Sequence, residues 1–201
     1  HPLRCLLVSL VHPSYPDKEN FGRKEMVLPL HEIKDLVIEQ IQIVKNLATE
    51  AGFTLHHVKP HGALYNRAAR DINIAIIIAE AVKEVDPKLI LFGLANSESG
   101  KAAEKVGLNF YNEVFADRTY TDDGKLTPRT ESNALIVTKE ASIEQVLRMI
   151  QKEEVISTSG KIIPIKADTI CIHGDGTHAV DFVKLLNKLI LDSNIRISSN
   201  S

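Results

Sequence analysis

The chain has 201 residues, of which 44% are hydrophobic and 25% are charged, so it is long enough to bury a core and has the composition of a globular protein. Its formal net charge of −2 and its lack of any lysine or arginine cluster argue against a nucleic-acid-binding protein. No apolar run is long enough to cross a membrane, and two cysteines do not make a disulfide framework, so we expect a reduced, cytoplasmic protein with a single domain over residues 1–201.

Short β-type runs alternate with helical runs along the chain, which predicts an α/β domain with a mainly parallel sheet. Residues 5–11 form the first predicted strand, which ends in a loop with two prolines. Apolar residues at helical spacing then predict a helix over residues 30–51, and a strand over 53–58 follows it. Pro60 must end that strand because proline has no backbone donor, and a helix can begin after Gly62.

The middle of the chain continues the alternation. Asp71 and Ser97 each precede a helical run, and both residue types are favoured N-caps because their side-chain oxygens accept from free backbone N–H groups. Gly107 supplies a C-terminal stop for the second of these helices. The predicted elements are a helix over 71–85, a strand over 89–92, a helix over 97–107 and a strand over 108–116.

The last third of the chain is predicted to hold two helices, a small hairpin and a strand. Ser142, with Gln145 three residues later, fits a capping box at the start of the first helix. Residues 155–165 alternate around a Ser-Gly pair and predict the hairpin. A strand over 169–172 follows, and Thr177 is the predicted cap of the last helix.

Polar motifs directly follow four of the predicted strands. In a parallel β/α fold the carboxyl ends of the strands lie on one face, so these motifs are predicted to converge on one rim. A single histidine after a strand is more often an ordinary loop residue, but four motifs at equivalent positions are a stronger signal. The motifs are His12, Lys59 with His61, Asp117 with Arg118, and His173 with Asp175.

The residue types leave the chemistry open between a metal site and acid–base catalysis. Histidines and aspartates bind divalent metals that activate water, and they also move protons without a metal. No two candidates have the i, i+4 spacing of a helical metal pair, so only the fold can bring them together. The catalytic candidates are His12, His61, Asp117 and Asp175, of which His12 and His61 are the candidate ligands if a metal is bound.

Cationic side chains and one loop predict a site for an anionic group such as a carboxylate or a phosphate. Lys59 and Arg118 carry the positive charges, and residues 173–176 (His-Gly-Asp-Gly) present backbone N–H groups ahead of a predicted helix. We therefore assign Lys59, Arg118, His173 and Gly174 to substrate or anion binding. The loop is not a Walker A sequence, and the chain has no Gly-x-Ser-x-Gly elbow.

The adjacent His56 and His57 are interpreted as ordinary strand residues. Because side chains alternate along a strand, one of the two is predicted to face away from the core. Neither is assigned to the site.

These motifs, in this order, resemble the LamB/YcsF family, which comprises the A subunits of 5-oxoprolinase. The resemblance covers nearly everything from His12 to about Leu191. The matching stretches are His12-Pro13-Ser14-Tyr15-Pro16-Asp17 with Phe21-Gly22-Arg23, then Val58 to Asn66, then Phe115-Ala116-Asp117-Arg118 with Tyr120, Gly124, Leu126 and Arg129, and last Ile172-His173-Gly174-Asp175.

The resemblance implies an irregular seven-stranded (β/α) barrel of the glycoside hydrolase and polysaccharide deacetylase type. Family members begin with an Asp-x-Asn-x-Asp-x-Gly-Glu-like strand and a segment resembling Asn-x-Ala-Cys-Gly-Phe-His-Ala-Gly-Asp. Neither occurs in this sequence, so we expect a barrel that lacks its first two β/α units. Carried over by motif, the site residues are His12, Lys59, His61, Asp117, Arg118, His173 and Asp175.

The resemblance also implies a hydrolase that acts on the C–N bond of a cyclic amide. It would open the lactam 5-oxoproline (pyroglutamate) to L-glutamate with hydrolysis of ATP, together with partner subunits B and C. A divalent metal, Mg²⁺ or Zn²⁺, is a further expected cofactor, and a homo-oligomer is a further expected assembly.

Two other classes of function remain open. The resemblance to the glycoside hydrolase and polysaccharide deacetylase type allows a metal-dependent amide or N-acetyl (carbohydrate) hydrolase. The metal content of the purified protein would distinguish this hydrolase from the ATP-dependent one. A shortened barrel would also leave sheet edges and apolar surface exposed, so a partner-binding fragment without activity is the third alternative.

Overall fold

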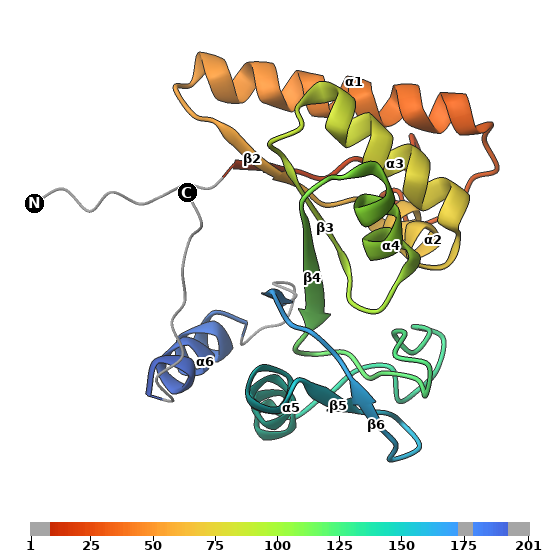
Figure 1. Cartoon of the computed structure of the whole chain (residues 1–201). Coiled ribbons are helices and arrows are strands. Elements are labelled where there is room, and N and C mark those ends of the chain that lie inside the picture. The colour runs from red at the N-terminus through yellow and green to blue at the C-terminus, as the bar shows by residue number, and fades with distance from the viewer. Residues whose placement is uncertain (1–8, 173–178, 193–201) are drawn as a thin grey trace, which may run out of the picture. The chain divides into compact units, whose positions relative to one another are not determined.

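The computed structural model describes residues 9–172 and 179–192 of the chain. They form two compact units, unit 1 up to Tyr111 and unit 2 from Asn112 onward. Both units combine helices with strands, so the predicted α/β class is confirmed for the described residues (Figure 1).

Unit 1 alternates strands and helices in the predicted order. Within the described residues, the predicted boundaries agree with the structure to about two residues, the usual uncertainty of an element's end. The elements of unit 1 are β1 (Ser9–Val11), α1 (Leu30–Glu50), β2 (Leu55–Val58), α2 (Gly62–Arg70), α3 (Ile72–Val85), β3 (Ile90–Leu94), α4 (Glu98–Val106) and the first residues of β4 (Phe110–Phe115).

The sheet of unit 1 has the order β1-β2-β3, and neighbouring strands in it are parallel. Parallel pairing follows from the helical crossovers, which return the chain to the same edge before each new strand. The register between β1 and β2 shifts by one residue, since Ser9 pairs with Leu55 but Leu10 pairs with His57. His56 is therefore an extra residue in β2, as in a β-bulge.

The core of unit 1 lies between its sheet and its helices. In α1, Ile33, Val37 and Ile41 are fully buried, and their spacing places them along one stripe of the helix. Val58 of β2 and Leu91 of β3 are paired and belong to the same buried cluster. Figure 1 shows α1 and α3 running side by side over this core, and the two helices are in contact.

Local capping signals in unit 1 were predicted correctly. The Asp71 carboxylate accepts from the backbone N–H groups of Asn73 and Ile74 at the start of α3. Ser97 accepts from the N–H of Ser99 at the start of α4. Gly107 ends α4 with φ +67°, a left-handed conformation that glycine adopts without steric cost.

Unit 2 holds the rest of β4 and a parallel partner for it, β7. The predicted hairpin is confirmed as an antiparallel pair of β5 and β6, whose connecting turn is closed by a bond from Ser157 N to Lys161 O (2.8 Å). The remaining elements of unit 2 are α5 (Lys139–Lys152), β5 (Glu154–Ile156), β6 (Ile162–Pro164), β7 (Thr169–Cys171) and α6 (Ala179–Asp192).

The predicted capping box at Ser142 and Gln145 is wrong. The N-cap of α5 is Thr138, four residues before Ser142, and the helix begins at Lys139. The Thr138 side chain accepts from Ala141 N. Ser142 lies inside the helix and donates its hydroxyl to Ala116 O (2.5 Å). A serine and a glutamine three apart match the box pattern, but here both side chains are used for tertiary contacts.

Several fold predictions stay predictions. The closed seven-stranded barrel, the absent first two β/α units and the single domain are not tested by the described residues. Residues 5–8 of the first predicted strand and the predicted cap Thr177 lie outside them. Within residues 9–172 and 179–192, no helix has the length and apolar character that a membrane span requires.

Candidate functional site

The loops that follow β1 and β2 are joined by backbone hydrogen bonds. The bonds continue the parallel pairing of the two strands past their ends, so the polar residues of the two loops are fixed next to one another. Lys59, His61 and Ala63 donate their backbone N–H groups to the carbonyls of Val11, Pro13 and Gly22 at 2.9–3.0 Å.

A close approach of two glycines makes this loop pairing feasible. Gly62 has φ +59°, and a Cβ built on it would lie only 2.5 Å from the carbonyl oxygen of Gly22. No side chain fits at that distance, so a residue without Cβ is required after His61. The glycine of the Lys-Pro-His-Gly motif is thus explained by backbone packing, and the same residue begins α2.

His12 and His61 lie next to each other with their ring centroids 6.2 Å apart. His12 Nδ1 is 2.9 Å from the carbonyl of Lys59, and His61 Nε2 is 3.0 Å from the carbonyl of Phe21. Because a carbonyl only accepts, each of these nitrogens must carry the proton. In the neutral rings, the lone pair is therefore on Nε2 of His12 and on Nδ1 of His61.

Lys59 connects the two histidines. Its backbone carbonyl accepts from His12, and His61 follows it by two residues. The residue is half-buried, and its amino group sits 5.8 Å from the ring centroid of the buried Tyr65, within the range of a cation–π contact. The structure thus brings together His12, Lys59 and His61, two potential proton carriers and one cation.

Two side chains anchor the long loop after β1. From α1, Gln40 forms two hydrogen bonds with the backbone of Ser14, accepting from its N–H at 3.0 Å and donating to its carbonyl at 2.9 Å. From α2, Arg67 donates to the hydroxyl of the fully buried Tyr15 (3.3 Å) and to Met26 O (3.0 Å). The loop that carries His12 is therefore held by both flanking helices.

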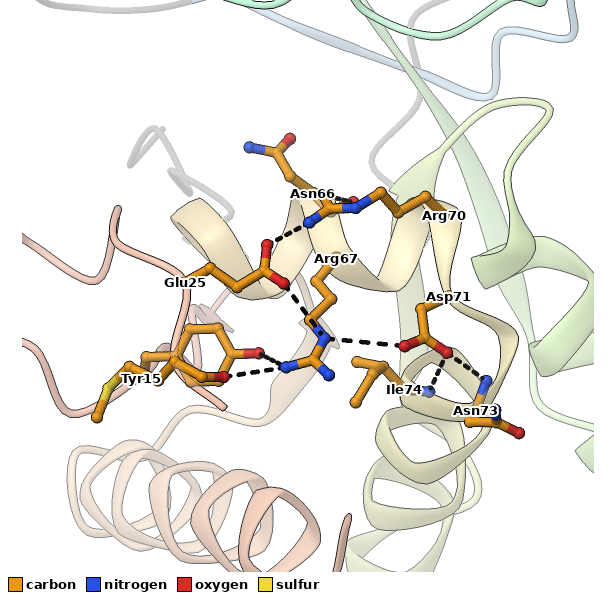
Figure 2. Close-up of polar contacts among 9 residues, drawn as sticks. Tyr15, Glu25, Asn66, Arg67, Arg70, Asp71, Asn73 and Ile74 are labelled. Atoms are coloured by element: carbon orange, nitrogen blue, oxygen red, sulfur yellow. Dashed lines mark hydrogen bonds and ion pairs between the residues drawn. The ribbon is translucent and has the colours of Figure 1, made fainter. Parts of the chain in front are cut away.

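Figure 2 shows Arg67 at the centre of an ionic cluster that ties this loop to α2 and α3. Its Nε lies 3.6 Å from Glu25 in the loop and 3.8 Å from Asp71, the N-cap of α3. Arg70, one turn further along α2, forms a second ion pair with Glu25. Because His61 immediately precedes α2, the cluster fixes both sides of the histidine pair.

Another histidine near this site is not among the site residues predicted from the sequence. The rings of His56 and His57 are in contact, with their Nδ1 atoms 3.2 Å apart. Regular alternation would point adjacent side chains to opposite faces, but β2 has an extra residue at this point, and the two rings are in contact. The only available signal was the pair of histidines immediately before the Lys-Pro-His motif, because a bulge leaves no pattern of its own.

His57 is uncharged at neutral pH. Burial, together with the nearby charges of His56, His12 and Lys59, lowers the pKa of His57 to about 4. The His57 ring is therefore close enough to His12 and Lys59 for their charges to act on it. One face of the ring is stacked on Phe92 of β3 at 4.0 Å between centroids.

Asp117 and Arg118 belong to unit 2. The Arg118 side chain is buried, and it donates to the carbonyls of Thr127 (2.6 Å) and Ala134 (3.2 Å). Burial lowers the pKa of Arg118 from its ordinary value. These bonds give the guanidinium a structural role in the loop between β4 and α5, and its anion-binding role stays a prediction. Asp117 is half-buried, and its backbone carbonyl accepts from Ile136 N at 3.0 Å.

His173, Gly174 and Asp175 lie outside the described residues. The convergence of all four motifs on one rim therefore stays a prediction.

The histidine pair fits part of a metal site. Metal-binding histidines usually donate their second ring nitrogen to a backbone carbonyl or a carboxylate, as His12 and His61 do here. Among the described residues, however, no group of three or more histidine, cysteine, aspartate or glutamate side chains could hold a metal ion. His12 and His61 would supply two ligands, and a third would have to come from elsewhere.

Comparison with known proteins identifies the family. A model of the LamB/YcsF family matches residues 9–201. The chain belongs to the LamB/YcsF family. The resemblance seen in the four motifs is thereby confirmed.

Two of the similar relatives carry the same name. The A subunit of 5-oxoprolinase from Bacillus subtilis (strain 168) is 47% identical over 190 residues, which is 94% of this chain and 74% of the relative. The protein of the same name from Erwinia tasmaniensis is 49% identical over 189 residues, 94% of this chain and 77% of the relative. The crystal structure of a lactam utilization protein from Thermus thermophilus matches with a TM-score of 0.85 and 35% identity, and covers 92% of this chain and 74% of that chain.

Proposed function

We propose that this protein is one subunit of a 5-oxoprolinase, a hydrolase that opens the C–N bond of a cyclic amide. The observation that carries the proposal is the identity of 47% and 49% to proteins named as the A subunit of 5-oxoprolinase, over 94% of the chain. The word "subunit" in that name supports a complex with partners, which we propose to be subunits B and C. Self-association into a homo-oligomer is part of the same proposal.

In this proposal the reaction is the ATP-dependent hydrolysis of 5-oxoproline to L-glutamate. ATP would supply the activation of the lactam oxygen. Lys59, whose charge lies beside the histidine pair, would bind the substrate carboxylate. Arg118 is also assigned to anion binding, but its guanidinium donates to two backbone carbonyls. Lys59 is therefore the better-supported cation of the proposed site.

Ring opening requires two proton transfers. A proton must leave the attacking water, and a proton must reach the ring nitrogen as it becomes the amino group of glutamate. The lone pairs on His12 Nε2 and His61 Nδ1 suit the first task, and either ring in its protonated form suits the second. Asp117 and Asp175 stay candidate catalytic residues of the proposed reaction.

The test is release of glutamate from 5-oxoproline with and without ATP and subunits B and C. The complete mixture is expected to release glutamate, and His61→Asn is expected to lower the rate by about a hundredfold or more. His31→Asn is the matched control, because His31 is exposed on α1 in the same unit. No release above background in the complete mixture would reject the proposal.

The second candidate function is a metal-dependent amide or N-acetyl hydrolase. The observation that favours it is that His12 and His61 each donate one ring nitrogen to a backbone carbonyl, an arrangement typical of metal ligands. Imidazole ligands suit Zn²⁺ better than Mg²⁺. A stoichiometric divalent ion that is lost in His12→Asn would support this candidate, and a fully active protein without metal would count against it.

A further inference from the structure

Aromatic rings from three strands of unit 1 are stacked on one another. His57 of β2 lies against Phe92 of β3 with a centroid distance of 4.0 Å and an angle of 15° between the rings. Phe92 in turn lies 5.3 Å from Tyr111 of β4, at an angle of 25°. We call His57, Phe92 and Tyr111 the aromatic row.

The aromatic row lies on the sheet face that is turned away from the helices. Val58 and Leu91 are paired across β2 and β3 and point into the helix-covered core. Side chains alternate along a strand, so His57 and Phe92, which flank those two residues, point to the opposite face. Lys59 follows Val58 and therefore points to the same face as His57. When the pairing of β2 with β3 is continued by one residue, Lys59 lies opposite Phe92.

The row and its neighbours differ sharply in charge. Phe92 and Tyr111 are half-buried and apolar over most of their rings, and His57 is neutral at physiological pH because its pKa is lowered to about 4. Lys59 follows His57 by two residues on the same face, so its positive charge lies beside the row. The face therefore presents an uncharged, ring-lined surface with a cation beside it.

We propose that the aromatic row binds the flat, uncharged ring of the substrate while Lys59 binds its carboxylate. The ligand class is a small planar cyclic amide that carries a carboxylate on a neighbouring ring atom. This inference rests on the proposed function and adds to it a division of the site into a ring-binding part and a charge-binding part.

The physical basis is the different solvation of the two halves of such a ligand. A lactam ring has no formal charge and loses little on leaving water for contact with aromatic side chains, which attract flat groups by dispersion. A carboxylate needs a charged partner when water is removed from it. Proline has the same carboxylate, but its ring nitrogen is a charged amine, so the neutral row disfavours it.

The experiment measures binding of two ligands to the full chain by titration calorimetry. 5-Oxoproline has both the lactam ring and the carboxylate, and 2-pyrrolidinone has only the ring. Phe92→Leu is expected to weaken binding of both ligands about tenfold, because it keeps apolar volume but removes the ring. Lys59→Met is expected to weaken binding of 5-oxoproline about tenfold and to leave 2-pyrrolidinone unchanged.

Phe53→Leu is the matched control, since Phe53 is an exposed phenylalanine of the same unit outside the row. Its binding of both ligands should equal that of the wild type. If Phe92→Leu does not fold by circular dichroism, Tyr111→Leu takes its place with the same expected loss for both ligands. The inference would be overturned if the row variant, Phe92→Leu or Tyr111→Leu, bound both ligands as tightly as the wild type does. It would also be overturned if the wild type did not bind 5-oxoproline.

The two proposals fail separately. The expected binding pattern without glutamate release from the complete mixture would reject the proposed function and leave the ring-binding surface standing. Glutamate release with the same KM for 5-oxoproline in Phe92→Leu and the wild type would reject the ring-binding surface alone.

Discussion

Mild acid is expected to destabilise the protein through His57. Its pKa is lowered from 6.5 to about 4, first by burial and then by the charges of His56, His12 and Lys59. Between these two pH values the unfolded chain binds a proton that the folded chain does not. The free energy of unfolding therefore falls as the pH is lowered from 6.5 towards 4. With these two pKa values the loss is about 2 kcal/mol at pH 5.

The assay is urea unfolding at pH 7 and pH 5 for the wild type and for His57→Asn, which keeps a polar side chain but does not titrate. Other titrating groups affect both proteins alike, so the difference between the two pH effects isolates His57. The wild type should lose about 2 kcal/mol more than the variant. By NMR, the His57 ring should stay neutral down to about pH 4, where its pKa lies. Equal losses in both proteins, or titration near pH 6.5, would refute this reasoning.

Three further predictions concern the framework of the site. Gly62→Ala should lower the free energy of unfolding by about 3 kcal/mol and impair turnover, because its Cβ would meet a backbone carbonyl at 2.5 Å. Gly52→Ala, at φ +79° with open space around it, should cost only about 1 kcal/mol in the same urea experiment, and equal costs would contradict the backbone clash. Gln40→Leu should cost about 1–2 kcal/mol and slow turnover, because both bonds to the β1 loop are lost; unchanged values would show that the loop is held without them. Arg118→Met should cost about 2–4 kcal/mol in thermal or urea unfolding, whereas Arg129→Met at an exposed position should cost under about 0.5 kcal/mol; similar effects of the two would argue against a structural Arg118.

Features that depend on near neighbours in the chain could be predicted from the residues alone. The N-cap at Asp71 and the left-handed glycine at position 107 are set by contacts within a few residues, and both were predicted. The alternation of strands and helices follows from local periodicity. The position of Lys59 and His61 at a strand end follows from Pro60, which stops the strand. The family was recognised from motifs whose order along the chain is visible without a structure.

Features that depend on distant partners became visible only in the fold. Ser142 and Gln145 match a capping box, but their side chains donate to Ala116 O and Arg118 O in the loop after β4, which no local pattern predicts. Arg118 looked like an anion-binding residue, and its burial against two carbonyls became visible only in the fold. A shift of one residue in the pairing of β1 with β2 places His57, in place of His56, opposite Leu10. Strand register depends on two chain segments together, and the direction of the side chains follows from the register. Neither can therefore be predicted from one segment alone.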